Sequence, residues 1–181
     1  MDIYQILITH NRAWSKKEVI IFCIIIVGVF LVLWGLIRYR KIKKIQAIAT
    51  IALVVFMWIV LASTVFTREQ TIRRYKLIPF WSWEKIIFEK DMSLLQENFL
   101  NCILLMPIGC LLPMVMAHAV KLKNVFAVGV IFSAVIEFSQ LICKRGMFEW
   151  DDIIHNGLGC VIGCFLTNEI IKLYKKRKSI R

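Results

Sequence analysis

Residues 125–143, VFAVGVIFSAVIEFSQLIC, form an apolar stretch that carries a single carboxyl group, Glu137. An α-helix of about 20 apolar residues crosses the ~30 Å hydrocarbon core of a bilayer, so this stretch predicts a membrane span. A charged group within hydrocarbon costs at least ~3 kcal/mol, and such groups usually have a partner or a function. Gln140 lies one turn after Glu137 on the same helix face. The stretch therefore predicts a membrane protein and a candidate functional position within it.

The whole chain has the composition of a membrane protein, with 181 residues, 59% hydrophobic residues and a mean hydropathy of +0.70. A soluble domain of this size is nearer 45–50% apolar. Backbone polar groups in lipid must satisfy one another, so each long apolar stretch is expected to be a helix. We predict an all-α polytopic fold with five transmembrane helices, at residues 19–37, 45–66, 99–120, 125–143 and 153–171.

The distribution of Lys and Arg predicts the orientation and the division of the chain. Basic residues cluster in the loop at 38–44 and in the tail at 172–181, and cytoplasmic segments favour such clusters. With five spans, both segments lie inside and the N-terminus lies outside. The loop at 67–98 carries both basic and acidic residues, so four or six spans stay open. We divide the chain into 1–44 with the first helix, a core at 45–171 and a basic tail at 172–181; the first helix is predicted to be an addition to a four-helix core.

The formal net charge of +12 and the six cysteines exclude some classes of function. The positive charge borders apolar stretches, as is usual for membrane helices, and no nucleic-acid-binding motif accompanies it. Nucleic acid is therefore not an expected partner. The cysteines lie in apolar segments without metal-ligand spacing, so we interpret them as small packing residues.

One loop has an interfacial character. The segment IPFWSW at residues 78–83 holds three aromatic residues and a proline, and Trp favours the membrane–water interface. We expect a short amphipathic or re-entrant piece on the outer surface.

Polar residues of three predicted spans are expected to meet near that surface. Glu137 could instead form a structural ion pair with Arg73, Arg74 or Arg145. Asp151 is expected to cap the last helix, whereas Asp152 and Asn156 share a face at i, i+4. Gly159 and Gly163 continue that face as G-x-x-x-G and are expected to pack helices closely. The candidate ligand-binding residues are Arg73, Arg74, Asn101, Glu137, Gln140, Arg145, Asp151, Asp152 and Asn156.

Several chemistries suit these residues. Their oxygen atoms could hold a divalent cation or an amine, and Glu137 and Asp152 are the candidate acid and base for hydrolysis. Arg68, Arg73 and Arg74 could contact a phosphate. No nucleophile motif is present, and no cofactor is expected beyond the cation. His155 is expected to be an interface residue and not a base.

Three motifs resemble those of the VanZ-like family. RRYKLIPF at 73–80 is similar to its "R…NLIPF" element, and NCILLMPIGCLLP at 101–113 to its "N-x-LLF-x-PFG-x-LLP" helix. EFSQ at 137–140, Arg145 and DDIIHNGLG at 151–159 resemble its "E-x-x-Q…R…D-x-x-DD-x-x-x-N-x-x-G" ending. The departures, at Lys76, Met106, Ile108 and Gly157, spare the charged positions. The resemblance covers about residues 45–171.

The resemblance implies a bacterial inner-membrane protein. The family is named for a protein that gives low-level resistance to teicoplanin, a glycopeptide antibiotic that binds cell-wall precursors. We therefore expect an outward-facing polar cleft that recognises membrane lipids or lipid-linked cell-wall precursors, with Arg145 and Arg73 or Arg74 holding an anionic head group. The alternatives are a hydrolase of lipid-linked phosphate and a structural or transport accessory subunit. Five spans are few for a transporter, so that last role would need a homo-oligomer.

Overall fold

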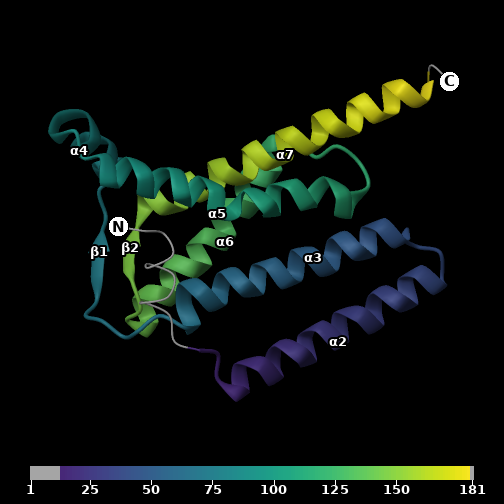
Figure 1. Ribbon diagram of the computed structural model, residues 1–181, viewed down its shortest axis with the longest axis horizontal. Helices are drawn as coiled ribbons and strands as arrows, with labels where there is room; N and C mark the ends of the chain where they lie inside the picture. Colours follow the sequence, from purple (N-terminus) through teal and green to yellow (C-terminus); the bar gives the residue numbers. More distant parts are fainter. Residues whose placement is uncertain (1–12, 180–181) are drawn as a thin grey trace.

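The computed structural model describes residues 13–179, and five of its helices are long and apolar enough to cross a membrane (Figure 1). The predicted all-α fold with five spans is thereby confirmed. The ends of the predicted N-terminal segment and tail, residues 1–12 and 180–181, lie outside the described residues. The spanning helices are α2 (Lys16–Arg38), α3 (Lys44–Leu61, continued by the π-helix η1, Ala62–Phe66), α5 (Met92–Met116), α6 (Leu122–Cys143) and α7 (Trp150–Ser179).

The starts of α5 and α7, near the covered end, differ from those that hydropathy predicts, and α7 continues to Ser179, past the predicted end at residue 171. α5 begins at Met92 and not near residue 99, because the Asp91 side chain accepts hydrogen bonds from the amides of Ser93 and Leu94 and caps the helix. The first turns of α5 contain polar residues, so a hydropathy average does not recognise them as part of the span. α7 begins at Trp150, which places Asp151 and Asp152 in its first turn.

The first helix lies at the edge of the bundle. α2 packs against α3, and the rings of Phe22 and Trp58 stack with centroids 5.5 Å apart. Of the most apolar 18-residue stretch of α2, only 6% is buried within the chain. This arrangement agrees with the expectation that α2 is an addition to a four-helix core.

The centre of the bundle is the contact between α5 and α7, where the two backbones touch. A Cβ atom on Gly159 would lie 1.9 Å from the carbonyl oxygen of Cys102, and one on Gly163 would lie 2.1 Å from that of Met106. From the α5 side, a Cβ on Gly109 would lie 1.9 Å from the Cys160 carbonyl oxygen. The predicted G-x-x-x-G packing is thus present, and it fixes α5 against α7.

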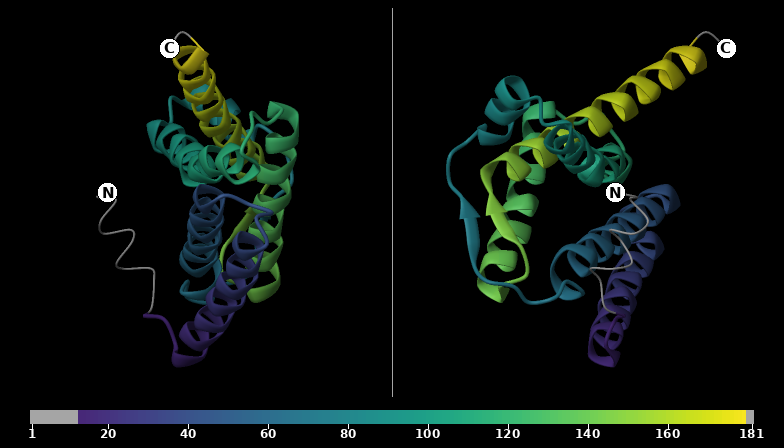
Figure 2. Two further views of the ribbon diagram at one scale, coloured as in Figure 1. Left: turned by 90° about the vertical axis from the view of Figure 1, so that its right-hand side faces the viewer. Right: turned by 60° about the vertical axis from the view of Figure 1, so that its left-hand side comes forward.

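One end of the bundle is covered by the segments between the spans. The strand β1 (Arg74–Lys76) pairs in parallel with β2 (Met147–Glu149), and the short helix α4 (Trp81–Glu89) lies beside them (Figures 1 and 2). At the far end lie the basic α2–α3 loop, the α5–α6 loop and the end of α7. The C-terminal end of α3, the N-terminal turns of α5, the C-terminal turns of α6 and the start of α7 therefore share the covered end.

Candidate functional site

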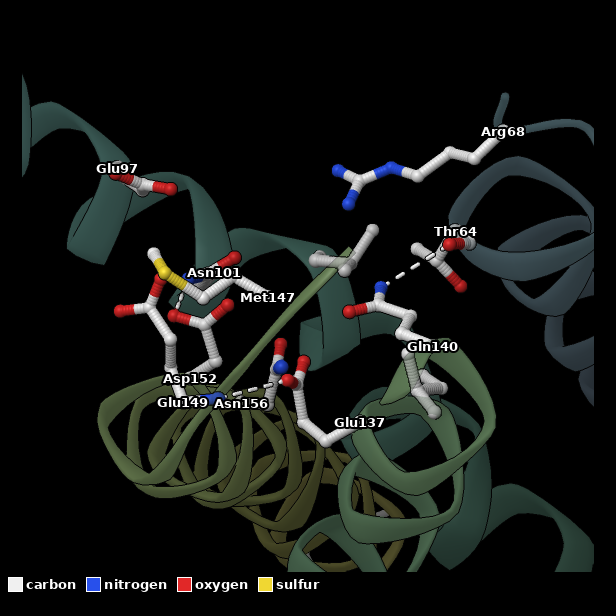
Figure 3. A pocket seen from close by; sticks show the side chains of 12 residues that line it. Thr64, Arg68, Glu97, Asn101, Glu137, Gln140, Met147, Glu149, Asp152 and Asn156 are labelled. Carbon is white, nitrogen blue, oxygen red and sulfur yellow. Dashed lines mark hydrogen bonds between the residues drawn. The ribbon is translucent and has the colours of Figure 1, made fainter. Parts of the chain in front are cut away.

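A polar pocket of about 210 Å³ lies at the covered end, among α5, α6, α7, η1 and β2 (Figure 3). The pocket contains five of the nine residues that the sequence nominated as ligand-binding. Its lining residues are Thr64, Arg68, Glu97, Asn101, Leu104, Ile136, Glu137, Gln140, Met147, Glu149, Asp152 and Asn156.

α6 supplies Glu137 and Gln140 on one face, and both side chains are buried. The Glu137 Oε2 atom accepts a hydrogen bond of 3.1 Å from the backbone N–H of Glu149. Gln140 donates from Nε2 to the Thr64 carbonyl oxygen at 3.1 Å. The buried carboxyl at position 137 is therefore anchored to β2 and faces the start of α7.

α7 supplies Asp152 and Asn156, one turn apart. Asp152 accepts a 2.6 Å hydrogen bond from Asn101 Nδ2, which links α7 to α5. Asn156 is 3% exposed and donates from Nδ2 to Ser133 Oγ at 2.8 Å. Its Oδ1 atom is buried and has no hydrogen-bond partner within residues 13–179. An amide oxygen is thus available on the pocket wall.

Glu149, at the end of β2, is a pocket residue that the sequence analysis missed. Burial and then the nearby charge of Glu97 raise the pKa of Glu149 from 4.5 to about 7, against a hydrogen bond from the Trp81 indole at 3.1 Å. Glu97 and Thr64 were missed as well. Arg68, Arg73 and Arg74 are the arginines expected to contact a phosphate, and of these Arg68 lines the pocket. Glu97 lies one turn before Asn101, a spacing that could have indicated it.

Asp151 points away from the pocket, into the start of α4. Its carboxylate accepts hydrogen bonds from the backbone N–H groups of Phe80 and Ser82, the latter at 3.0 Å, and from the Ser82 hydroxyl. Asn98 of α5 donates to the same hydroxyl at 3.0 Å. The expectation that Asp151 caps its own helix is wrong: it caps α4, where the N-terminal amides and dipole favour an anion.

The basic residues expected to hold an anion have other surroundings. Arg145 donates from Nη1 to the carbonyl oxygens of Val65 at 3.1 Å and Phe66 at 2.6 Å, at the C-terminal end of η1. Arg74 lies in β1, and Arg73 is exposed just before it. None of the three lines the pocket.

The ion-pair alternative for Glu137 is also wrong. Over residues 13–179, the ion pairs join Lys85 to Glu89 and Lys172 to Glu169, far from Glu137 in the sequence.

His155 faces the α4 side of the bundle. Its Nε2 atom accepts a 2.9 Å hydrogen bond from the Trp83 indole N–H, and the two rings lie with centroids 5.8 Å apart. The histidine is buried and absent from the pocket lining, as an interface residue would be.

A divalent cation stays a prediction. Within the described part of the chain, no group of three His, Cys, Asp or Glu side chains is arranged to hold a metal ion.

Comparison with known proteins identifies one family. The profile of the VanZ/LLP1 family matches residues 45–172, which include every residue that lines the pocket. No curated protein and no solved structure matches the chain.

Proposed function

This chain belongs to the VanZ-like family, and from that membership we propose that its pocket recognises the polar head of a cell-envelope amphiphile in the inner membrane of a bacterium. By occupying or redistributing that amphiphile, the protein would lower access of teicoplanin to the cell surface. The observation that carries the proposal is the polar pocket at the end of an apolar bundle, with Glu137, Asp152 and Asn156 at its floor.

The dimensions of the pocket favour a head group. Drug-sized ligands usually fill pockets of about 300–1,000 Å³, and a volume of 210 Å³ is smaller. The helices around it expose large apolar side chains, such as Phe99 on α5 and Phe138 on α6, along which acyl chains can lie. A small polar head in the pocket with its tail in the bilayer satisfies both features.

The charge pattern supports a pocket that faces outward. Lys and Arg cluster in the α2–α3 loop and at the end of α7, both at the end opposite the pocket. Cytoplasmic segments carry such clusters, so the pocket would open on the outer side, where glycopeptides act.

Teicoplanin susceptibility tests the proposal in cells that carry the gene, lack it, or carry Glu137→Gln. Glutamine preserves the size of the side chain and its ability to accept from the Glu149 amide, so a change reports the carboxyl group. Glu169→Gln, an exposed position on α7 remote from the pocket, is the matched control. We expect the gene and the control to raise the inhibitory concentration and Glu137→Gln to lose that effect. Equal susceptibility of all four strains would reject the role in resistance.

A second candidate function is hydrolysis of a lipid-linked phosphate. It is favoured by two carboxyl groups, Glu137 and Asp152, that line one pocket with Arg68. One carboxyl would donate a proton and the other would activate water, while the arginine would contact the phosphate. Release of phosphate from undecaprenyl or phospholipid substrates by the purified protein, with and without Mg²⁺, distinguishes this function from binding alone. Absence of turnover under both conditions would exclude it.

A further inference from the structure

We propose that the head group bound in this pocket is zwitterionic: a primary ammonium joined to a phosphate through a short linker, as in an aminoalkyl phosphate lipid. This inference rests on the proposed recognition of an amphiphile and adds the chemical class of its head. Three independent features of the pocket support it: an excess of acceptors, an unpaired amide oxygen and a single arginine at the opposite wall.

The acceptors outnumber the donors by far. Glu97, Glu137, Glu149 and Asp152 line the pocket together, and only three of their eight carboxylate oxygens accept a hydrogen bond from the described residues. The pocket amides of Asn101 and Gln140 are already committed, since each donates to a protein oxygen. A ligand that brings N–H donors and positive charge therefore complements this wall of the pocket.

Asn156 gives a second and independent indication of a donor ligand. Its Nδ2 is fixed by Ser133 Oγ at 2.8 Å, which fixes Oδ1 as the acceptor on the pocket wall. That oxygen is buried without a donor in residues 13–179. Buried polar atoms in folded proteins almost always have a partner, so the geometry indicates a group that arrives with the ligand.

Arg68 supplies the opposite charge on the other side. In Figure 3 its guanidinium lies across the pocket from Glu97 and Asp152, near Gln140. Among the described residues its guanidinium has no hydrogen bond or ion pair. A guanidinium binds phosphate oxygens through paired N–H donors, so the pocket is positive at one wall and negative at the other.

The volume limits the linker. At about 30 Å³ per water molecule, 210 Å³ corresponds to about seven waters, which suits a phosphate with a two- or three-atom arm. A primary ammonium is favoured over a quaternary one, because only the former donates N–H bonds to Asn156 and the carboxylates.

Binding of three short-chain lipids to the purified full-length protein in detergent tests the inference. The probes are dihexanoyl phosphatidylethanolamine, phosphatidylcholine and phosphatidylglycerol, titrated by native mass spectrometry. We expect the ethanolamine lipid to bind about tenfold or more tightly than either of the others, since choline lacks N–H donors and glycerol lacks the charge. Glycerophosphoethanolamine, without acyl chains, shows whether the tail is required.

Two exposed pocket residues, Glu97 and Arg68, allow the charge assignment to be tested without loss of folding. Glu97→Gln and Arg68→Gln should each weaken binding of the ethanolamine lipid, whereas Glu84→Gln, an exposed position on α4 outside the pocket, should not. Only Arg68→Gln should weaken the residual binding of the glycerol lipid. Melting temperatures of the variants verify that they are folded.

The outcomes separate this inference from the function on which it rests. Tightest binding of phosphatidylglycerol, or tighter binding after Glu97→Gln, would overturn the zwitterionic head group and leave recognition of an amphiphile intact. Equal binding of glycerophosphoethanolamine and the lipid would support the chemistry and count against an amphiphile. Failure of all lipids to bind would overturn both.

Discussion

Replacing Gly159 with alanine should separate the two central helices. The new Cβ would lie 1.9 Å from the Cys102 carbonyl oxygen, whereas real Cβ atoms essentially never come within 3.0 Å of another atom. The obstacle is backbone and not a flexible side chain, so α5 and α7 must move apart by roughly 1 Å, the least that sterics allow at this contact. The same displacement stretches the 2.6 Å hydrogen bond between Asn101 and Asp152 at the pocket.

Overpacking of this kind costs about 1–3 kcal/mol of unfolding free energy. For a chain of this length, that corresponds to a fall of about 2–12 °C in melting temperature. Thermal unfolding of the purified protein in detergent, followed by tryptophan fluorescence, measures it. Gly28→Ala on α2 is the matched control, because a Cβ there meets nothing within 4 Å. Its melting temperature should be unchanged or slightly higher, since alanine favours helix over glycine. Identical melting of the two variants would refute backbone contact between α5 and α7.

Two further predictions concern the covered end of the bundle. Glu149→Gln should raise the melting temperature at pH 8 and leave it unchanged near pH 4. The folded protein binds the Glu149 proton more tightly than the unfolded chain does. The unfolding free energy of the wild type therefore falls by up to about 3 kcal/mol as the pH rises from 4.5 to about 7. A constant difference between pH 4 and pH 8 would show that titration of Glu149 is not responsible. Arg145→Leu should lower the unfolding free energy by about 2–3 kcal/mol, measured by chemical denaturation, because the carbonyls of Val65 and Phe66 lose charge-assisted donors. Arg73→Leu, at an exposed position, is its control, and equal loss in both variants would contradict the capping role.

The spans and part of the pocket follow from the sequence because they depend on local patterns. Apolar length alone indicates five helices, and helical periodicity places Glu137 with Gln140 and Asp152 with Asn156. A carboxyl group in an apolar span is expected to contact other polar groups, so the sequence predicts that these two pairs lie close to Asn101.

The remaining pocket residues depend on long-range contacts that periodicity does not encode. Glu149 reaches the pocket because β2 pairs with β1, although two spans separate these strands in the sequence. Asp151 has the signature of a cap for its own helix, and only the position of α4 shows which helix it caps. The sequence predicts that Arg145 binds an anion, whereas in the structure it donates to carbonyl oxygens at the end of η1.

The π-helix that ends α3 makes the register of the following segment depend on a single residue. A π-turn holds one more residue than an α-turn, and here it offers the carbonyl oxygens of Thr64, Val65 and Phe66 to Gln140 and Arg145. Deleting one residue within 62–66 would let the segment close as an ordinary α-turn and would change which carbonyl oxygens face Gln140 and Arg145. The mean hydropathy of the span would stay nearly the same. The number of residues at this point therefore determines how α3 is joined to α6, independently of the apolar length that inserts the helix into the bilayer.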